Sequence, residues 1–451
     1  MKATGRSIFA AIRGRSYATQ AATKQADIAA KQDAKLTRLP NGMIVASVEN
    51  NSPVSRIAVF YNAGPRFEGS DSGITHAVRS AASLSSTQAT AFGISRNIQQ
   101  IGGSLQCTST REHMIYSVEC LRNNLETGVE QLSYVTTSPA FKPWEVKEIS
   151  AKQQLDLAIL QQQPEVRVIE ALHKAAFRNT LGNSLYSPDF CIGSYSPEQL
   201  AAFVSSNYTS GNMSIVGVGV DQEDLLQLVK KYFGKVASGN GPSVQNSVFH
   251  GDEVRIDAPG SLVHAAIASE GLGLGDSKLL AQGVLLHVLG TGPYVKYGIN
   301  NATSKLGQAA AANTSGAFSA TAISASYSDS GLFGFQVVAP AEDAAKMLQA
   351  MVDATNKLTE EKIQDADVAR AKKQLKVALA TRMENQADVL QYMGITSLLG
   401  GQVLAYDDLA SAIDKVTVAD VTEVAKKVIT GKPAMAVVGN LMNTPYLDQL
   451  L

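Results

Sequence analysis

The sequence predicts an α+β fold of two homologous domains in tandem, each a largely antiparallel sheet packed against several helices. The chain has 451 residues, which is more than one hydrophobic core usually supports, so two domains are expected. In each half, apolar strands cluster before the helices and are joined by short turns. This order favours a layered α+β domain over a parallel doubly wound one. The same order of elements then recurs in the second half.

The first half begins with strands and continues into helices. Residues 114–121 are the clearest strand. Its members Met114, Tyr116, Val118 and Cys120 alternate with Ile115, Ser117 and Glu119, as in a half-buried strand. The other elements expected in this half are strands at 44–48, 56–61 and 104–110, and helices at 74–84 and 144–160.

The second half repeats that order. Its expected elements are strands at 254–256, 263–269, 317–325 and 332–339, and helices at 277–289 and 363–382.

Each half closes with a capped helix followed by a buried strand. Ser196, with Pro197 and Gln199 behind it, has the spacing of a capping box, and the apolar strand 213–219 follows the helix. Thr417 opens the corresponding helix of the second half, before the strand at 435–439. These paired units indicate a duplication.

Composition divides the chain further. Residues 237–252 are rich in Ser, Gly and Asn and are typical of a linker between domains at 36–236 and 253–451. Residues 18–35 lack an apolar stripe, and we expect a flexible leader there.

The N-terminus predicts a mitochondrial transit peptide over residues 1–17. Residues 1–26 contain no Asp or Glu, and basic residues accompany an apolar helical edge. The alternative is a disordered basic tail. Arg15 and Tyr17 precede the small residue Ala18, which resembles a matrix processing signal with the mature chain starting at Ala18.

Charge and cysteine content exclude several classes of function. The formal net charge is −1 and becomes −5 without the four basic residues of 1–17, so a nucleic-acid partner, which needs a basic surface, is not expected. No apolar run is long enough for a membrane-spanning helix. The three cysteines, Cys107, Cys120 and Cys191, are an odd number without close spacing, which argues against a disulfide framework or a zinc knuckle.

The segment 73–80 is the most informative for function. It reads as the start of a helix with one histidine, His76, whose i+4 neighbour is Ser80. Two histidines at that spacing could bind one zinc ion, but Ser80 is no such partner. Arg79 is a cation that repels a divalent metal and offers no general base.

These residues resemble the pitrilysin-type metallopeptidases, as do the strand at 39–45 and the segment 62–66. That family has a pitrilysin/LuxS-like metallohydrolase fold and an inverted zinc motif, His-x-x-Glu-His, on this helix. The resemblance places His76 on the first histidine, Arg79 on the glutamate base and Ser80 on the second histidine. It therefore implies a vestigial zinc motif, with no catalytic residue, no bound metal and no cofactor.

The family's last zinc ligand is a glutamate on a later helix. The resemblance aligns that ligand with Lys152, while Glu148 and Asp156 lie close enough to leave the register open.

Two mitochondrial branches of the family lack the motif: the glycine-rich-loop subunit of the processing peptidase and a core subunit of ubiquinol–cytochrome c reductase, respiratory complex III. Residues 288–304 do not show the glycine run of the first branch, whereas 292–296, 301–304, 108–112 and 183–186 resemble the second. The resemblance implies a non-catalytic subunit on the matrix side of the inner membrane, supporting assembly and stability of the complex. Its partners would be a core protein 1 homologue and the cytochrome b, cytochrome c1 and Rieske subunits.

Two other functions remain open: a presequence-binding processing-peptidase subunit, and an active zinc peptidase in which His76 has unidentified co-ligands. Glu170 and His173 also have a metal-compatible Glu-x-x-His spacing, but without a second such pair the spacing is better explained by chance on a helix surface. The glycines in 271–275 lack a nucleotide-binding spacing and predict a strand-to-helix loop.

Overall fold

Two mixed β-sheets organise the computed structural model, which describes residues 33–243, 245–292, 302–314, 316–361 and 363–451. The transit peptide predicted at 1–17, including Arg15, Tyr17 and Ala18, lies outside the described residues, as does most of the leader.

The elements of the first half, in chain order, are β1 (Lys35–Arg38), β2 (Ile44–Val48), β3 (Val54–Tyr61), α2 (Ile74–Ala81), α3 (Ala91–Gln100), β4 (Ser104–Ser109), β5 (Met114–Leu121), α4 (Leu125–Thr137), α5 (Pro143–Gln161), α6 (Pro164–Phe177), α7 (Pro197–Asn207), β6 (Met213–Val218) and α8 (Gln222–Phe233).

Those of the second half are β7 (Glu253–Asp257), β8 (Leu262–Gly271), α9 (Leu279–Leu289), α10 (Lys305–Asn313), β9 (Ser319–Ser326), β10 (Gly331–Pro340), α11 (Ala344–Glu360), α12 (Asp365–Glu384), α13 (Gln386–Leu398), α14 (Tyr406–Lys415), α15 (Val418–Ile429), β11 (Ala434–Gly439) and α16 (Leu447–Leu450).

Five strands of each sheet follow the same topology, and the first sheet has β1 in addition. The first has six strands in the order β1-β2-β6-β3-β5-β4, and the second has five in the order β7-β11-β8-β10-β9. In each sheet one pair is parallel, β2 with β6 and β7 with β11, and the other pairs are antiparallel. The predicted tandem α+β fold with largely antiparallel sheets is therefore confirmed.

Helices from the same half cover one face of each sheet. In the first half, buried side chains of α2, α4, α7 and α8 join those of the strands in one apolar cluster. In the second half, α9, α11 and α15 form the corresponding cluster with β8 and β10. These two clusters are the main hydrophobic cores.

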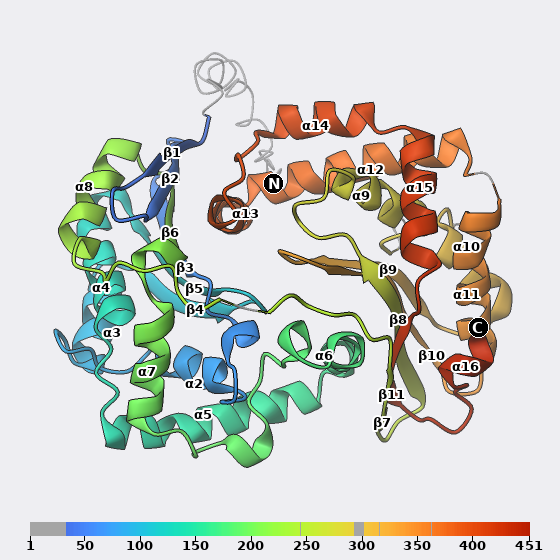
Figure 1. Cartoon of the computed structure of the whole chain (residues 1–451), viewed down its shortest axis with the longest axis horizontal. Helices are drawn as coiled ribbons and strands as arrows, with labels where there is room; N and C mark the ends of the chain where they lie inside the picture. Colours follow the sequence, from blue (N-terminus) through green and yellow to red (C-terminus); the bar gives the residue numbers. More distant parts are fainter. Residues whose placement is uncertain (1–32, 244, 293–301, 315, 362) are drawn as a thin grey trace, which may run out of the picture. The chain divides into compact units, whose positions relative to one another are not determined.

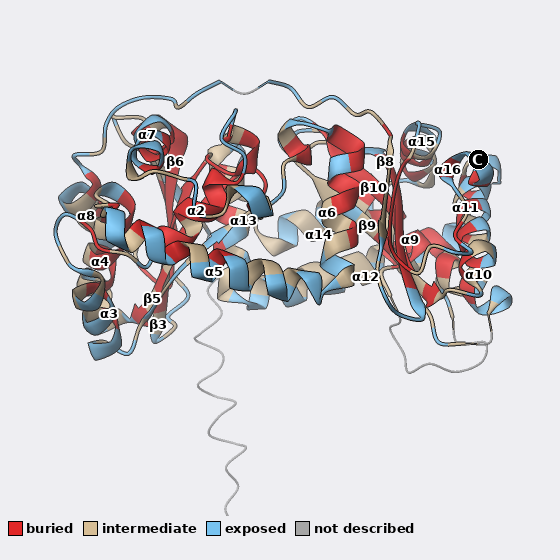
Figure 2. Ribbon diagram, turned by 90° about the horizontal axis from the view of Figure 1, so that it is seen from below, coloured by how far each residue is buried: buried red, intermediate tan, exposed pale blue. Residues whose placement is uncertain are grey.

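The opposite face of each sheet is covered by a helix from the other half. Helix α6 packs on β11 and β8 of the second sheet, and α13 packs on β6 and β3 of the first (Figure 1). The side of α6 toward the second sheet is buried (Figure 2). Each half therefore supplies a helix that covers the sheet of the other half. The domain boundaries at 36–236 and 253–451 stay a prediction. The proposed linker, 237–252, is largely exposed and has no helix or strand among its described residues.

Small residues allow these exchanged helices to approach the sheets closely. Under α6 the strands present alanines such as Ala266 and Ala436. In α13, Gly394 lies directly against the Phe60 ring of β3, where a Cβ atom would stand 2.3 Å from Phe60 Cε2. Two flat, apolar surfaces are therefore buried between the halves.

Local capping follows the sequence. The Ser196 hydroxyl accepts a hydrogen bond from Gln199 N (3.2 Å), and Ser196 N donates to Gln199 Oε1 (2.8 Å). Thr417 forms the equivalent capping box with Asp420. The capping box predicted at Ser196 is confirmed, and the helix predicted to open at Thr417 has a capping box as well.

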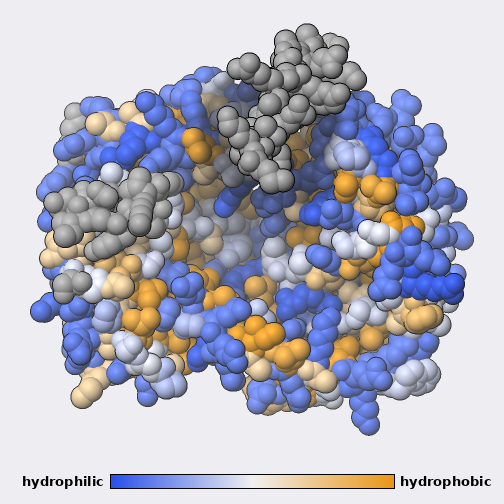
Figure 3. All heavy atoms as spheres, turned by 180° about the vertical axis from the view of Figure 1, so that it is seen from behind, coloured by the Kyte–Doolittle hydropathy of each residue, from blue (hydrophilic) through white to orange (hydrophobic). Residues whose placement is uncertain are grey.

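Within the described parts of the chain, no helix has the length and hydrophobicity needed to cross a membrane. Figure 3 shows that hydrophobic residues on the visible face form several separate groups among hydrophilic ones.

Candidate functional site

Helix α2, which carries the predicted site residues, begins at a tightly packed turn. Gly73 has φ 83°, and a Cβ there would lie 2.5 Å from Ser187 Cα, so only glycine fits. The buried Glu68 carboxylate accepts hydrogen bonds from Gly73 N (2.7 Å) and Thr75 N (3.1 Å). The Ser187 hydroxyl donates to Gly73 O (2.7 Å). Contacts within the protein thus fix the start of α2.

His76 is fully buried, and both of its ring nitrogens are engaged. Ser187 N donates to Nδ1 (3.1 Å), and Nε2 lies 3.0 Å from Asp156 Oδ2. Because a backbone N–H can only donate, Nδ1 carries no proton, and Nε2–H donates to Asp156. Burial lowers the pKa of His76, and the neighbouring Arg79 and Lys152 lower it further, against the raising effect of Asp156. The ring is therefore neutral, with no free lone pair.

Arg79 points to the strand side of the site. Its Nη1 donates to Ser109 Oγ of β4 (2.7 Å), and its guanidinium carbon lies 5.5 Å from the centre of the Tyr186 ring. The His76 ring meets the same tyrosine edge to face, at 5.6 Å between centres. Tyr186 therefore packs against both residues.

Ser80 and Lys152 lie on facing helices. Ser80 is buried, and among the described residues its hydroxyl has no hydrogen-bond partner. Lys152 Nζ, from α5, donates to Ser80 O (3.4 Å). Of the three residues considered on α5 for the last zinc ligand, two approach α2: Lys152 contacts Ser80, and Asp156 contacts His76. The third, Glu148, is exposed.

Comparison with known proteins places this helix in a family. Residues 44–189 match the family described as insulinase (peptidase family M16), and residues 194–375 match the peptidase M16 inactive domain. Cytochrome b-c1 complex subunit 2, mitochondrial, from Homo sapiens is 40% identical over 93% of this chain and 92% of its own length. The chain belongs to the M16 peptidase family.

Other M16 relatives are similar to a smaller degree. The Mus musculus cytochrome b-c1 complex subunit 2 is 39% identical over 93% of this chain and 92% of its own length. A probable mitochondrial-processing peptidase subunit alpha-2 from Arabidopsis thaliana is 28% identical over 92% of this chain and 84% of its own length.

The residues that the resemblance places at the metallopeptidase motif do not fit a zinc ion. Zinc in proteins is held by three or four His, Cys, Asp or Glu side chains. Here Arg79 and Lys152 bring positive charge, Ser80 is a neutral hydroxyl, and both nitrogens of His76 are already bonded. In the described part of the chain, no group of three or more such ligands is close enough to hold a metal. No reaction step through a metal follows from this site.

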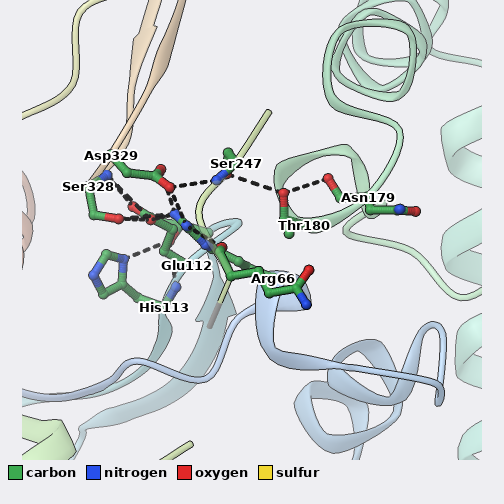
Figure 4. Close-up of polar contacts among 10 residues, drawn as sticks. Arg66, Glu112, His113, Asn179, Thr180, Ser247, Ser328 and Asp329 are labelled. Carbon is green, nitrogen blue, oxygen red and sulfur yellow. Dashed lines mark hydrogen bonds and ion pairs between the residues drawn. The ribbon is translucent and has the colours of Figure 1, made fainter. Parts of the chain in front are cut away.

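A second polar cluster, which no sequence motif indicates, joins the two halves (Figure 4). Arg66 Nη1 lies 2.7 Å from Glu112 Oε1, and Nη2 lies 2.5 Å from Asp329 Oδ2. The backbone of Ser328 donates to Glu112 (3.0 Å), and that of Ser247 to Asp329 (2.7 Å). The Arg66 side chain is only 5% exposed, and no spacing in the sequence links it to Asp329.

Glu170 and His173 each make a structural contact with another residue. Glu170 pairs with Arg111, and His173 Nε2 lies 2.7 Å from the Tyr327 hydroxyl of the other half. The two groups have different partners, which agrees with the expectation that their spacing arises by chance.

Proposed function

We propose that this chain is core protein 2, a non-catalytic core subunit of mitochondrial respiratory complex III. It lies on the matrix side of the inner membrane, peripheral to the bilayer. It supports assembly and stability of the complex during electron transfer from ubiquinol to cytochrome c. The partners are a core protein 1 homologue and the cytochrome b, cytochrome c1 and Rieske subunits.

The observation that carries the proposal is the state of His76. With Nδ1 bonded to Ser187 N and Nε2 to Asp156, the one histidine of the motif is a structural residue. Arg79 stands where the family's general base lies, and a guanidinium cannot take a proton from water. The similarity to cytochrome b-c1 complex subunit 2 across 93% of the chain supports the choice of complex.

Purification through a tag on this chain, after mild detergent extraction of mitochondria, tests the proposal. We expect cytochromes b and c1 in one native-gel band with the chain, identified by their haem absorbance. Recovery of the chain only as a free heterodimer with a catalytic peptidase subunit would contradict the proposal.

A presequence-binding subunit of the mitochondrial processing peptidase is the second candidate. It is favoured by the 28% identity to a processing-peptidase alpha subunit over 92% of this chain. A fluorescent presequence peptide added with the catalytic partner separates the two, because only the second candidate predicts saturable binding. One zinc per chain and chelator-sensitive cleavage would instead indicate an active peptidase.

A further inference from the structure

The site on α2 carries two cations without carboxylate partners. Helix α2 contacts both β4 and α5 (Figure 1). Arg79 of α2 donates to Ser109 of β4, and Lys152 of α5 donates to the Ser80 carbonyl of α2. Arg79 bonds only the neutral Ser109 hydroxyl and the Tyr186 ring, and Lys152 only the Ser80 carbonyl. Among the described residues, neither cation lies within ion-pair distance of an Asp or Glu.

The buried His76 and the half-buried Cys107 both feel the charge of the two cations. Arg79 and Lys152 both lower the pKa of His76, and both act to lower that of Cys107, which burial nevertheless raises to about 12. The Asp156 carboxylate beside them is directed to His76 Nε2. With His76 neutral, these three charged groups leave one net positive charge at the site.

The buried hydroxyl of Ser80 adds a polar group that the protein does not satisfy. Its residue is 1% exposed, and its oxygen has no partner among the described residues. A buried polar group without a partner needs a physical explanation, and a bound polar atom is one that the two neighbouring cations favour.

We propose that this site binds an oxyanion of the phosphate or carboxylate class. The Arg79 guanidinium and the Lys152 ammonium provide charge-assisted donors of the kind that recognise oxyanions. The resemblance places these three residues where the family has its glutamate base and two zinc ligands, so the proposed ligand is an anion where the family binds a cation. The proposal is independent of which complex the chain joins.

Calorimetric titration of the purified full-length chain with inorganic phosphate tests it, with sodium chloride at equal ionic strength as the baseline. We expect saturable binding of one phosphate per chain, weakened roughly tenfold or more in the double variant Arg79→Gln/Lys152→Gln. A parallel titration with acetate distinguishes the two sources, because a carboxylate site saturates with acetate at lower concentration than with phosphate.

The matched control is Arg96→Gln/Lys147→Gln, which removes the same charge. Lys147 is exposed on α5, five residues before Lys152, and Arg96 is exposed on α3. This control should bind phosphate as the parent does. If the first double variant fails to fold, the single Lys152→Gln variant, at an exposed position, replaces it and should still weaken binding severalfold. Binding of neither anion, equal losses in variant and control, or binding of zinc in place of an anion would each overturn the proposal.

Discussion

The contact between Gly394 of α13 and Phe60 of β3 should make Gly394→Ala destabilising. The added methyl would lie 2.3 Å from Phe60 Cε2 and 2.4 Å from Cζ, whereas carbon atoms pack best about 3.5–4.0 Å apart. Phe60 is fully buried within the first sheet, so its ring has no free space into which it could move. Helix α13 must therefore withdraw from the sheet by about 1 Å or more.

Two opposing effects set the size of this change. Overpacking of a filled core costs about 1–3 kcal/mol, and the fixed ring at Phe60 points to the upper end. Alanine in a helix interior is favoured over glycine by about 1 kcal/mol. We expect the free energy of unfolding to fall by about 2 kcal/mol in Gly394→Ala, measured as a lower midpoint of urea denaturation for the full chain.

Gly283→Ala in α9 is the control for helix propensity. Its Cβ would meet the flexible end of the Leu375 side chain at 3.3 Å, so we expect stability to be unchanged or raised by up to about 1 kcal/mol. Adding Phe60→Leu to Gly394→Ala should cost less than the sum of the two single changes, since the smaller side chain makes room. Equal stabilities of the two alanine variants, or strict additivity with Phe60→Leu, would refute the described packing of α13.

Three further outcomes are expected. Asp329→Asn should lower the unfolding free energy by about 2 kcal/mol, because the buried Arg66 keeps only Glu112 as a charged partner; thermal denaturation beside the exposed Asp448→Asn checks this. Burial lowers the pKa of His113 to about 4, so the unfolded chain binds more protons between pH 6.5 and 4 and stability falls as the pH falls through that window. Between pH 6.5 and 4 the free energy of unfolding of the parent should fall by about 3 kcal/mol more than that of His113→Asn, measured by urea denaturation at each pH. Ser196→Ala should cost about 1 kcal/mol through the lost helix cap, measured by the same denaturation.

Local patterns in the sequence were enough to predict most elements. The alternation around Tyr116 placed β5 at the residues found, because a strand with one buried face reports its period directly. The capping box at Ser196 and the helix start at Thr417 were equally local, since every bonded group lies within four residues. The resemblance also aligned Lys152 with the later zinc ligand, and Lys152 contacts Ser80 on α2.

Contacts between distant residues could not be predicted in this way. Nothing near Arg66 identifies Asp329 as its partner, because the pairing depends on how the two halves meet. The role of α13 could not be predicted either, because this helix contacts the first sheet and α12 and so shows no single apolar stripe in the sequence. The bond between His76 and Asp156 likewise depends on the angle at which α5 crosses α2.

The contacts that hold α2 explain why a metal-binding motif can be lost while the fold is kept. The helix start is fixed by the Glu68 carboxylate and by Ser187, and these bonds involve Gly73 and Thr75, not the motif positions. Asp156 and Ser187 then satisfy both nitrogens of His76. The residues at positions 79 and 80 can therefore change without loss of the bonds that support the helix. The placement of α2 depends on Glu68, Ser187 and Asp156, and it does not require a metal-binding residue at either position.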